Sequence, residues 1–308
     1  VIDFFEGTGS LEPTTIDTRA EFYQTLDFPE FDFSDVKGQE GIKRCMEIAA
    51  AGGHNIILIG PPGAGKTMLA KRLPSILPPM SLREALETTK IHSVAGKLKE
   101  VGLMNQRPFR SPHHTISNVA LVGGGSYPQP GEISMAHNGV LFLDELPEFK
   151  RDVLEVMRQP LEDREVTISR AKFTVTYPSS FMLVASMNPS PSGFFNDPDA
   201  PQTTSPHEMQ RYMNKISGPL LDRIDIHIEV TPVPFDKLSD ERKAETSVAI
   251  RKRVTHAREI QSSRFEAIPN LHYNAQMSTK HIREYCVLDE TSKELLKNAM
   301  ERLNLSAR

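Results

Sequence analysis

Four stretches of the chain carry consecutive apolar residues and end at glycine or polar residues. They cover residues 55–59, 139–145, 181–187 and 224–230. Apolar runs of this length, with such boundaries, are typical of strands that are buried on both faces of a sheet. The pattern therefore predicts an α/β fold in which helices cover a central sheet.

Between and after these strands, apolar residues recur at the spacing of three and four residues that helices show. Ser81 and Glu84 match a capping box, so we expect a helix to begin there. A segment rich in β-branched residues at 165–177, with a basic tip, predicts a hairpin. The expected helices cover residues 41–51, 68–77, 82–93, 150–158 and 239–265, with two more within 278–305.

A long stretch, residues 94–137, shows little regular periodicity. It contains the segment RPFRSPHHTIS and three consecutive glycines. Stretches of this length without regular structure are uncommon inside compact domains unless they are functional or disordered. Its arginines and histidines favour a functional insertion.

These elements divide the chain of 308 residues into three parts. Residues 1–34 mix acidic and aromatic side chains, and we expect them to form an extended leader. Residues 35–235 contain the predicted strands, the insertion and the hairpin, and form an α/β core domain. Residues 236–308 predict only helices, which form a smaller helical lid.

Composition narrows the class of protein. Hydrophobic residues make up 38% and charged residues 25%, as in soluble globular domains. No apolar run reaches the length of a transmembrane helix, and the N-terminus lacks the pattern of a signal peptide. Two cysteines, Cys45 and Cys286, exclude a disulfide framework and predict a cytoplasmic protein. The net charge of −4 means that any DNA contact depends on a local basic surface.

The strongest chemical signal is GPPGAGKT at residues 60–67. It matches the phosphate-loop pattern G-x-x-x-x-G-K-[ST], and it lies between a predicted strand and a predicted helix. Its glycines let backbone N–H groups turn toward phosphate oxygens, and the helix N-terminus adds partial positive charge. We expect Lys66 to reach the β- and γ-phosphates and the Thr67 hydroxyl to bind Mg²⁺. The chain is therefore predicted to bind a nucleoside triphosphate.

Two acidic residues, Asp144 and Glu145, end the second apolar stretch. Ligands of open α/β sheets bind at the carboxyl ends of the strands. We expect Asp144 to hold Mg²⁺ and Glu145 to orient and deprotonate an attacking water. The alternative is a pair of surface acids without a catalytic role.

Asn188 and Arg223 flank the two remaining apolar stretches. Asn188 can hydrogen-bond the γ-phosphate or the attacking water, although Asn-Pro is also a common turn. Arg223 can act in trans and neutralise charge on the γ-phosphate of a neighbouring subunit. The alternative for Arg223 is a structural ion pair with Asp222 or Asp225.

Four histidines, His92, His113, His114 and His137, lie in or near the insertion. A metal site is one interpretation of such a group. No thiol lies among them and their spacing is irregular, so the sequence favours polar loop histidines over metal ligands.

Six motifs in the chain are long and specific: GPPGAGKT, RPFRSPHHTIS, PGEISMAHNGVLFLDELPEF, RQPLED, MNPSPSG and SGPLLDRIDIH. Together they resemble the magnesium-chelatase-like AAA+ ATPases of the competence protein ComM (YifB) group. The resemblance begins near Phe33 and implies an AAA+ P-loop NTPase core with a central parallel sheet flanked by helices. The leader resembles the exit from a preceding domain, so we expect an ATPase core fragment. Many relatives carry Cys where this chain has Ser190 and Ser192, so no thiol or zinc role is expected there.

The resemblance also implies roles for single residues. It makes residues 60–67 the Walker A motif and identifies ATP and Mg²⁺ as the cofactors. Outside this motif, the implied functional residues are Asp144 and Glu145 as the Walker B pair, Asn188 as sensor 1, Arg223 as the arginine finger and Arg308 as the sensor-2 arginine. The expected nucleotide contacts are Gly60, Pro61, Pro62, Gly63, Ala64, Gly65, Lys66, Thr67, Met68, Gly38 and Gln39.

For the whole protein, the resemblance implies an ATP-driven homo-hexamer that acts on DNA, with branch migration in homologous recombination and natural transformation as its task. The insertion and the hairpin would line the pore, with Arg110, Arg170 and Lys172 as DNA contacts. A remodeller of protein partners, like the motor subunits of magnesium chelatase, is the alternative. A nucleotide-gated switch with little turnover is disfavoured by the presence of both Glu145 and Arg223.

Overall fold

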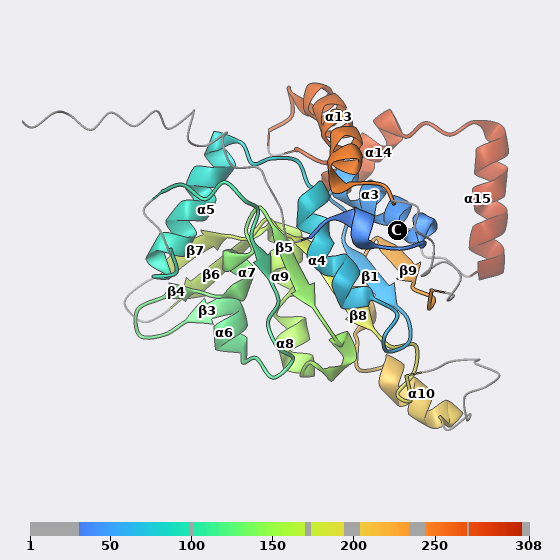
Figure 1. The fold of residues 1–308 in the computed structure, drawn as a ribbon, viewed down its shortest axis with the longest axis horizontal. Helices are drawn as coiled ribbons and strands as arrows, with labels where there is room; N and C mark the ends of the chain where they lie inside the picture. Colours follow the sequence, from blue (N-terminus) through green and yellow to red (C-terminus); the bar gives the residue numbers. More distant parts are fainter. Residues whose placement is uncertain are drawn as a thin grey trace, which may run out of the picture.

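The computed structural model describes residues 31–98, 102–169, 174–193, 204–233, 244–269 and 271–303. A parallel sheet of five strands forms the centre, with the order β2-β5-β8-β1-β9, and helices flank it (Figure 1). The strands are β1 (Ile56–Ile59), β2 (Phe109–Arg110), β5 (Val140–Leu143), β8 (Met182–Met187) and β9 (Ile226–Glu229). The predicted α/β fold with a central parallel sheet is therefore confirmed.

Two short antiparallel pairs lie outside this sheet. β3 (Gly123–Gly124) pairs with β4 (Gln129–Pro130), and β6 (Glu165–Ser169) pairs with β7 (Thr174–Pro178). The second pair forms at the predicted hairpin position. The tip of this hairpin, which includes Arg170 and Lys172, lies outside the described residues.

The helices follow the predicted positions along most of the chain. They are α3 (Glu40–Gly52), α4 (Lys66–Ile76), α5 (Leu82–Val94), α6 (Asn118–Val122), α7 (Glu132–Met135), α8 (Arg151–Glu155), α9 (Arg158–Asp163), α10 (Pro206–Met213), α11 (Gly218–Leu221), α13 (Ser247–Phe265), α14 (Thr279–Tyr285) and α15 (Glu290–Leu303). Short 3₁₀ turns lie at Phe33–Asp35, Leu146–Glu148 and Asn274–Gln276. The predicted capping box of α5 is present: the Ser81 side chain accepts from Glu84 N, and the Glu84 side chain accepts from Ser81 N.

Alternate residues of the central strands face two different hydrophobic cores, because side chains of a strand point to opposite sides. Ile56 and Leu58 of β1 lie in one core, under α3, α4 and α13. Ile57 lies in the other core, together with buried residues of α7, α8 and β6. Burial of both faces explains why the strands appear in the sequence as continuous apolar runs.

Three elements differ from the predictions made from the sequence. The helix predicted at 150–158 is divided into α8 and α9, and Pro160 lies in the first turn of α9, where proline favours the start of a helix. The helix predicted from residue 239 begins at Ser247, because the Thr246 side chain caps it by accepting from Ala249 N. The stretch 94–137 contributes β2 to the central sheet and contains four further short elements.

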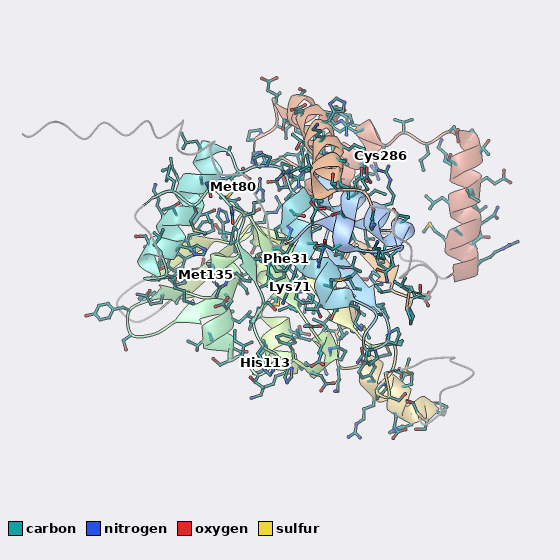
Figure 2. All side chains as sticks on the ribbon, in the orientation of Figure 1. Phe31, Lys71, Met80, His113, Met135 and Cys286 are labelled. Carbon is teal, nitrogen blue, oxygen red and sulfur yellow. The ribbon has the colours of Figure 1, made fainter. Side chains whose placement is uncertain are left out.

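The C-terminal helical segment packs against the core through α13, which lies over α3 and α4 (Figure 1). Arg253 forms ion pairs with Glu47, and Gln261 Nε2 donates to Ala51 O at 2.9 Å. Cys286 lies in the connection from α14 to α15 (Figure 2). Among the described residues, no helix combines the length and the apolar character that crossing a bilayer requires.

The described part of the leader is anchored to α13. Phe33 is fully buried in the core, and its backbone N donates to Ser247 Oγ at 2.8 Å. The Asp32 carboxylate accepts from Ser247 N at 3.1 and 3.2 Å. Residues 1–30 of the predicted leader lie outside the described residues.

Candidate nucleotide-binding and hydrolysis site

Three neighbouring parallel strands end at the same edge of the sheet. β8 lies between β1 and β5, and Ile59, the last residue of β1, is paired with Met187, the last residue of β8. Gly60 N continues this pairing by donating to Met187 O at 3.2 Å. The phosphate loop, Asn188 and the Asp144–Glu145 pair therefore meet at the carboxyl edge, where ligands of α/β sheets bind.

The phosphate loop requires glycine at particular positions. Gly63 and Gly65 have φ angles of 78° and 91°, in the left-handed region that side chains disfavour. A Cβ atom on Gly60 would lie 2.2 Å from Val230 O, so only glycine allows the residue after β9 to approach this closely. These conformations leave a compact turn directly before the N-terminus of α4.

Lys66 is buried at the first position of α4 and points back into the loop. Its Nζ donates to Gly60 O at 2.6 Å, to Pro61 O at 2.9 Å and to Asn188 Oδ1 at 3.1 Å. Burial lowers the pKa of the ammonium group, and the charges of Asp144 and Glu145 oppose this shift. The sequence-predicted Lys66 and Asn188 are thus in direct contact, although 122 residues separate them.

Asp144 is held by two hydroxyl groups. Thr67 Oγ1 donates to Asp144 Oδ2 at 2.8 Å, and Ser186 Oγ donates to Asp144 Oδ1. Oxygen ligands of this kind, a hydroxyl and a carboxylate in contact, suit Mg²⁺. The loop glycines, the buried ammonium group and this oxygen pair together fit a magnesium–triphosphate complex.

Sequence reasoning missed Ser186, which is fully buried in β8. A serine within the apolar run of residues 181–187 was the available signal, because a buried hydroxyl needs a hydrogen-bond partner. The Ser186 hydroxyl also accepts from Glu145 N at 3.3 Å, so it orients both acidic residues.

We expect Ser186→Ala to raise the Mg²⁺ concentration needed for half-maximal ATP hydrolysis by about 10–100-fold, the usual effect of removing a group that orients a metal ligand. The measurement is ATPase activity over a Mg²⁺ titration. The matched control is Ser75→Ala. Ser75 is also buried, but it lies near the C-terminal end of α4, where its hydroxyl donates to Arg72 O. An unchanged Mg²⁺ requirement in Ser186→Ala would contradict the orienting role.

Glu145 has an unusual backbone and an exposed side chain. Its φ angle is 55°, which is uncommon for a residue other than glycine, and its N donates to Asp144 Oδ1 at 3.1 Å. The side chain is 58% exposed, and Oε2 lies 3.4 Å from His114 Nδ1. The His114 ring lies 4.1 Å from the His113 ring and is tilted by 35° to it, and it packs edge-on against Phe149. This contact, which sequence reasoning also missed, connects the insertion to the candidate catalytic base.

The other expected nucleotide contacts lie close to the loop. Gln39 Nε2 donates to Ala64 O at 3.3 Å and to Thr231 O at 3.1 Å, so it joins the loop to the segment after β9. Gln39 and Gly38 have φ angles of 57° and 61°, which form a tight turn before α3. Met68 lies in the first turn of α4 and is 36% exposed.

Arg223 lies at the opposite edge of the sheet. It precedes β9, whose first residue Ile226 is paired with Ile56, the first residue of β1. The four residues of β1 separate this position from the phosphate loop by about 13 Å. Within one chain, Arg223 is therefore remote from Lys66.

The Arg223 guanidinium forms an ion pair with Glu162 and donates from Nη1 to Pro219 O at 2.6 Å. The alternative partner Asp225 accepts from Asn55 N at 3.2 Å, and its Oδ2 lies 3.2 Å from His54 Nδ1. Arg223 is thus fixed near a surface made by α9 and α11. The proposed sensor-2 residue Arg308 lies outside the described residues.

Arg110 is engaged in a structural ion pair. It belongs to β2, and its Nε and Nη2 donate to Glu132 at 2.5 and 2.7 Å. The tip residues Arg170 and Lys172, expected beside it as DNA contacts, lie outside the described residues. Arg110 is therefore positioned to hold α7 against the sheet.

The histidines of the insertion have separate surroundings. His92 Nε2 lies 3.0 Å from Met135 O, and His137 Nδ1 accepts from Ser180 N at 3.0 Å. Burial lowers the pKa of both imidazoles, which favours their neutral forms. Within the described ranges, no three His, Cys, Asp or Glu side chains form a cluster that could hold a metal ion.

Ser190 and Ser192 follow Asn188 in the loop after β8, and their hydroxyl oxygens lie 2.9 Å apart.

Two family models and several curated proteins are similar to this chain. Residues 32–238 match the family model of magnesium chelatase subunit ChlI, and residues 244–308 match the model of its C-terminal region. The chain is 44% identical to competence protein ComM of Haemophilus influenzae and 45% identical to the uncharacterized protein YifB of Salmonella typhimurium, in each case over all of this chain. It spans 59% of the length of each of these relatives. It is also 24% identical, over 52% of its length, to 51% of the magnesium-chelatase 38 kDa subunit of Rhodobacter capsulatus.

Proposed function

The chain belongs to the magnesium-chelatase-like AAA+ ATPases, and from this premise we propose that it is a motor that hydrolyses ATP. The observation that carries the proposal is the convergence of Lys66, Thr67 and Asp144 at one edge of the sheet, with Thr67 Oγ1 and Asp144 Oδ2 at 2.8 Å. Asn188 and Glu145 border the same point. The second carboxylate, Glu145, favours hydrolysis over binding alone. A site that only binds nucleotide has no water to activate and so needs no carboxylate next to the Mg²⁺ ligand Asp144.

Each residue has a distinct part in the proposed reaction. The loop N–H groups and the Lys66 ammonium bind the β- and γ-phosphates, and Lys66 exchanges its bonds to Gly60 O and Pro61 O for phosphate oxygens. Thr67 and Asp144 would hold Mg²⁺, which supplies neutralisation of negative charge on those oxygens. Glu145 accepts a proton from the attacking water, and Asn188 orients that water or the γ-phosphate.

We assign Arg223 to a neighbouring subunit's site in a homo-hexameric ring. Its place at the amino edge of the sheet prevents it from completing the site of its own chain, whereas a head-to-tail ring brings this edge to the next phosphate loop. The exchange of its Glu162 partner for a γ-phosphate would accompany assembly.

For the whole protein we propose a DNA helicase or branch-migration factor in homologous recombination and natural transformation. The support is the similarity to a protein named competence protein ComM. In this proposal the DNA contacts lie on the hairpin tip, at Arg170 and Lys172, because Arg110 is already bound by Glu132. The alternative is a remodeller of protein partners, favoured by the similarity to a magnesium-chelatase subunit and by the net charge of −4.

The test is ATP turnover of the full-length protein with single-stranded DNA, with forked DNA and without DNA, over a salt series. A DNA motor increases its turnover with DNA, and the apparent DNA affinity falls with salt by a log–log slope of about −0.7 for each contacted phosphate of a single strand. The control is Arg211→Gln, an exposed arginine on α10, which should leave the stimulation unchanged. Turnover that DNA does not change at any salt concentration favours the protein-remodelling alternative.

A further inference from the structure

Tyr212, on α10, reaches the loop that follows β8. Its hydroxyl donates to Asn188 O at 3.0 Å, across 24 residues of sequence. α10 itself lies at the carboxyl edge of the sheet (Figure 1). A side chain from outside the phosphate loop therefore contacts the backbone of the residue whose Oδ1 accepts from Lys66.

The ladder of the central sheet leaves the Asn188 carbonyl without a partner. Pairing between β8 and β1 ends at Met187, whose O accepts from Gly60 N at 3.2 Å. The next residue, Pro189, has no N–H group, and it restricts the backbone of the residue before it. Tyr212 thus supplies a hydrogen bond to the first peptide group beyond the sheet, and the Asn188 side chain extends from the same residue.

The surroundings of Tyr212 hold its ring in place and keep its hydroxyl protonated. The residue is 7% exposed and belongs to the hydrophobic core that also contains Leu146 and Met187. Burial raises the pKa of Tyr212 to about 12, and the charge of Glu148 adds to this shift. At neutral pH the hydroxyl therefore keeps its proton and acts as a donor.

A second contact attaches the end of α10 to the turn after β5. Lys215 Nζ lies 3.0 Å from Glu148 Oε1 and 5.8 Å from the centre of the Tyr212 ring. Glu148 belongs to the 3₁₀ turn that directly follows Glu145. Because the two charged side chains are 44% and 49% exposed, their ion pair contributes little to stability. It does fix the place of α10 between the loop after β8 and the turn after β5.

We propose that Tyr212 is a positioning residue for ATP hydrolysis, which acts by orienting Asn188 toward the γ-phosphate or the attacking water. This inference rests on the proposed function, because it assumes that Asn188 has this role. Lys66 holds Asn188 at its side-chain oxygen, and Tyr212 holds it at its backbone carbonyl. The bond from Tyr212 involves no group that binds phosphate, so it remains in place when Lys66 turns toward the nucleotide.

The experiment compares kcat and the affinity for a fluorescent ATP analogue in the full wild-type chain and in Tyr212→Phe. This substitution keeps the buried ring and removes only the hydroxyl. We expect kcat to fall by about 10-fold, between the effect of one lost hydrogen bond and that of a displacement of about 1 Å in a group that orients a reactant. The affinity should stay at the wild-type value, because the phosphate loop is unchanged.

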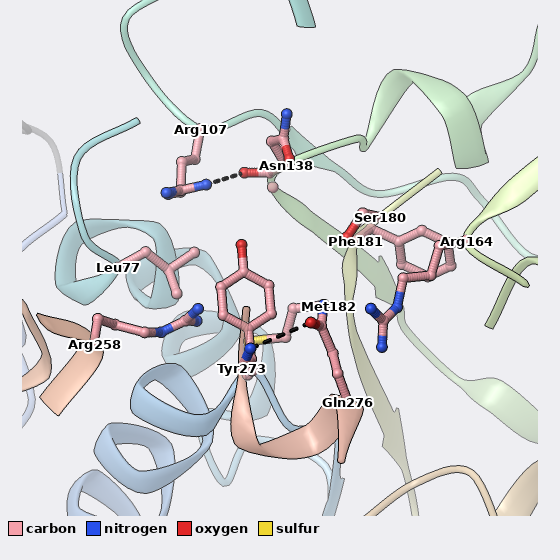
Figure 3. Close-up of a pocket in the computed structure, with 12 residues that line it drawn as sticks. Leu77, Arg107, Asn138, Arg164, Ser180, Phe181, Met182, Arg258, Tyr273 and Gln276 are labelled. Atoms are coloured by element: carbon pink, nitrogen blue, oxygen red, sulfur yellow. Dashed lines mark hydrogen bonds between the residues drawn. The ribbon is translucent and has the colours of Figure 1, made fainter. Parts of the chain in front are cut away.

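Two other tyrosines provide matched controls. Tyr177 is 9% exposed and its hydroxyl also donates to a backbone carbonyl, Pro128 O, at 2.9 Å. Tyr273 packs against Arg258 in a small cavity at the amino edge of the sheet (Figure 3). Tyr177→Phe and Tyr273→Phe should keep the wild-type kcat. Tyr177→Phe should lower the Tm about as much as the test variant does, because each loses one buried hydrogen bond.

A double-mutant cycle tests whether the effect passes through the Asn188 side chain. Asn188→Ala keeps the backbone carbonyl that Tyr212 binds but has no amide group left to orient. If Tyr212 acts through that amide, adding Tyr212→Phe to Asn188→Ala lowers kcat little further. A merely structural role of the hydroxyl lowers kcat by the same factor in both backgrounds.

Three results would overturn the proposal: wild-type kcat in Tyr212→Phe, an equal fall of kcat with and without the Asn188 side chain, or an equal fall in Tyr177→Phe. Failure of the proposed function looks different. In that case the wild-type chain itself binds the ATP analogue but does not hydrolyse ATP, and the role of Tyr212 is refuted together with that of Asn188.

Discussion

Lys66→Ala is expected to weaken the binding of ATP by about 10–150-fold, which corresponds to the loss of charge-assisted hydrogen bonds of 1.5–3 kcal/mol. Lys66 is the buried cation of the phosphate loop, and its Nζ lies within 2.6–3.1 Å of three oxygen acceptors at the point where the loop meets Asn188. No neighbouring side chain can replace it, because the loop backbone surrounds it. Equilibrium binding of a fluorescent ATP analogue measures the effect.

Two variants make this experiment specific. Lys71→Ala removes an exposed lysine of the same helix (Figure 2) and should keep the wild-type affinity. Lys66→Met keeps most of the length of the side chain without its charge, and it separates the loss of charge from a loss of packing. Wild-type affinity in Lys66→Ala, with the fold shown intact by circular dichroism, would refute the assignment of the phosphate site.

The second large effect concerns hydrolysis rather than binding. Glu145→Gln is expected to lower kcat by about 10²–10⁴-fold through loss of the general base. Arg223→Ala is expected to lower kcat by about 10³-fold through loss of charge neutralisation. Both variants should bind ATP with nearly unchanged affinity, because neither side chain contacts the loop that holds the phosphates.

Mixing the two inactive proteins tests whether Arg223 acts across an interface. In a randomly mixed ring, about a quarter of the interfaces combine an intact Glu145 on one subunit with an intact Arg223 on the next, so activity should partly return. The ATPase activity of each variant measured alone provides the baseline. Absence of activity in rings that contain both proteins, as shown by co-purification of differently tagged chains, would contradict an action in trans. Arg223 would then be a structural partner of Glu162.

The elements that local patterns control were predicted well. The strand at Ile56–Ile59, the capping box of Ser81 and the glycine loop before Lys66 all depend on residues close together in the chain. Backbone sterics, capping hydrogen bonds and burial of both strand faces act over these short distances. The two-residue strand Phe109–Arg110 lacked such a signal, because it is too short to show a period and is flanked by prolines.

By itself, the sequence determined the phosphate loop, the acids that end β5 and the α/β class, because each requires particular residue types at neighbouring positions. Only the tertiary structure decided that Ser186 orients Asp144, that His114 reaches Glu145, and that Arg223 lies at the edge of the sheet opposite to the phosphate loop. These contacts join residues far apart in the chain, and their geometry depends on strand order and register, which the local sequence pattern does not determine.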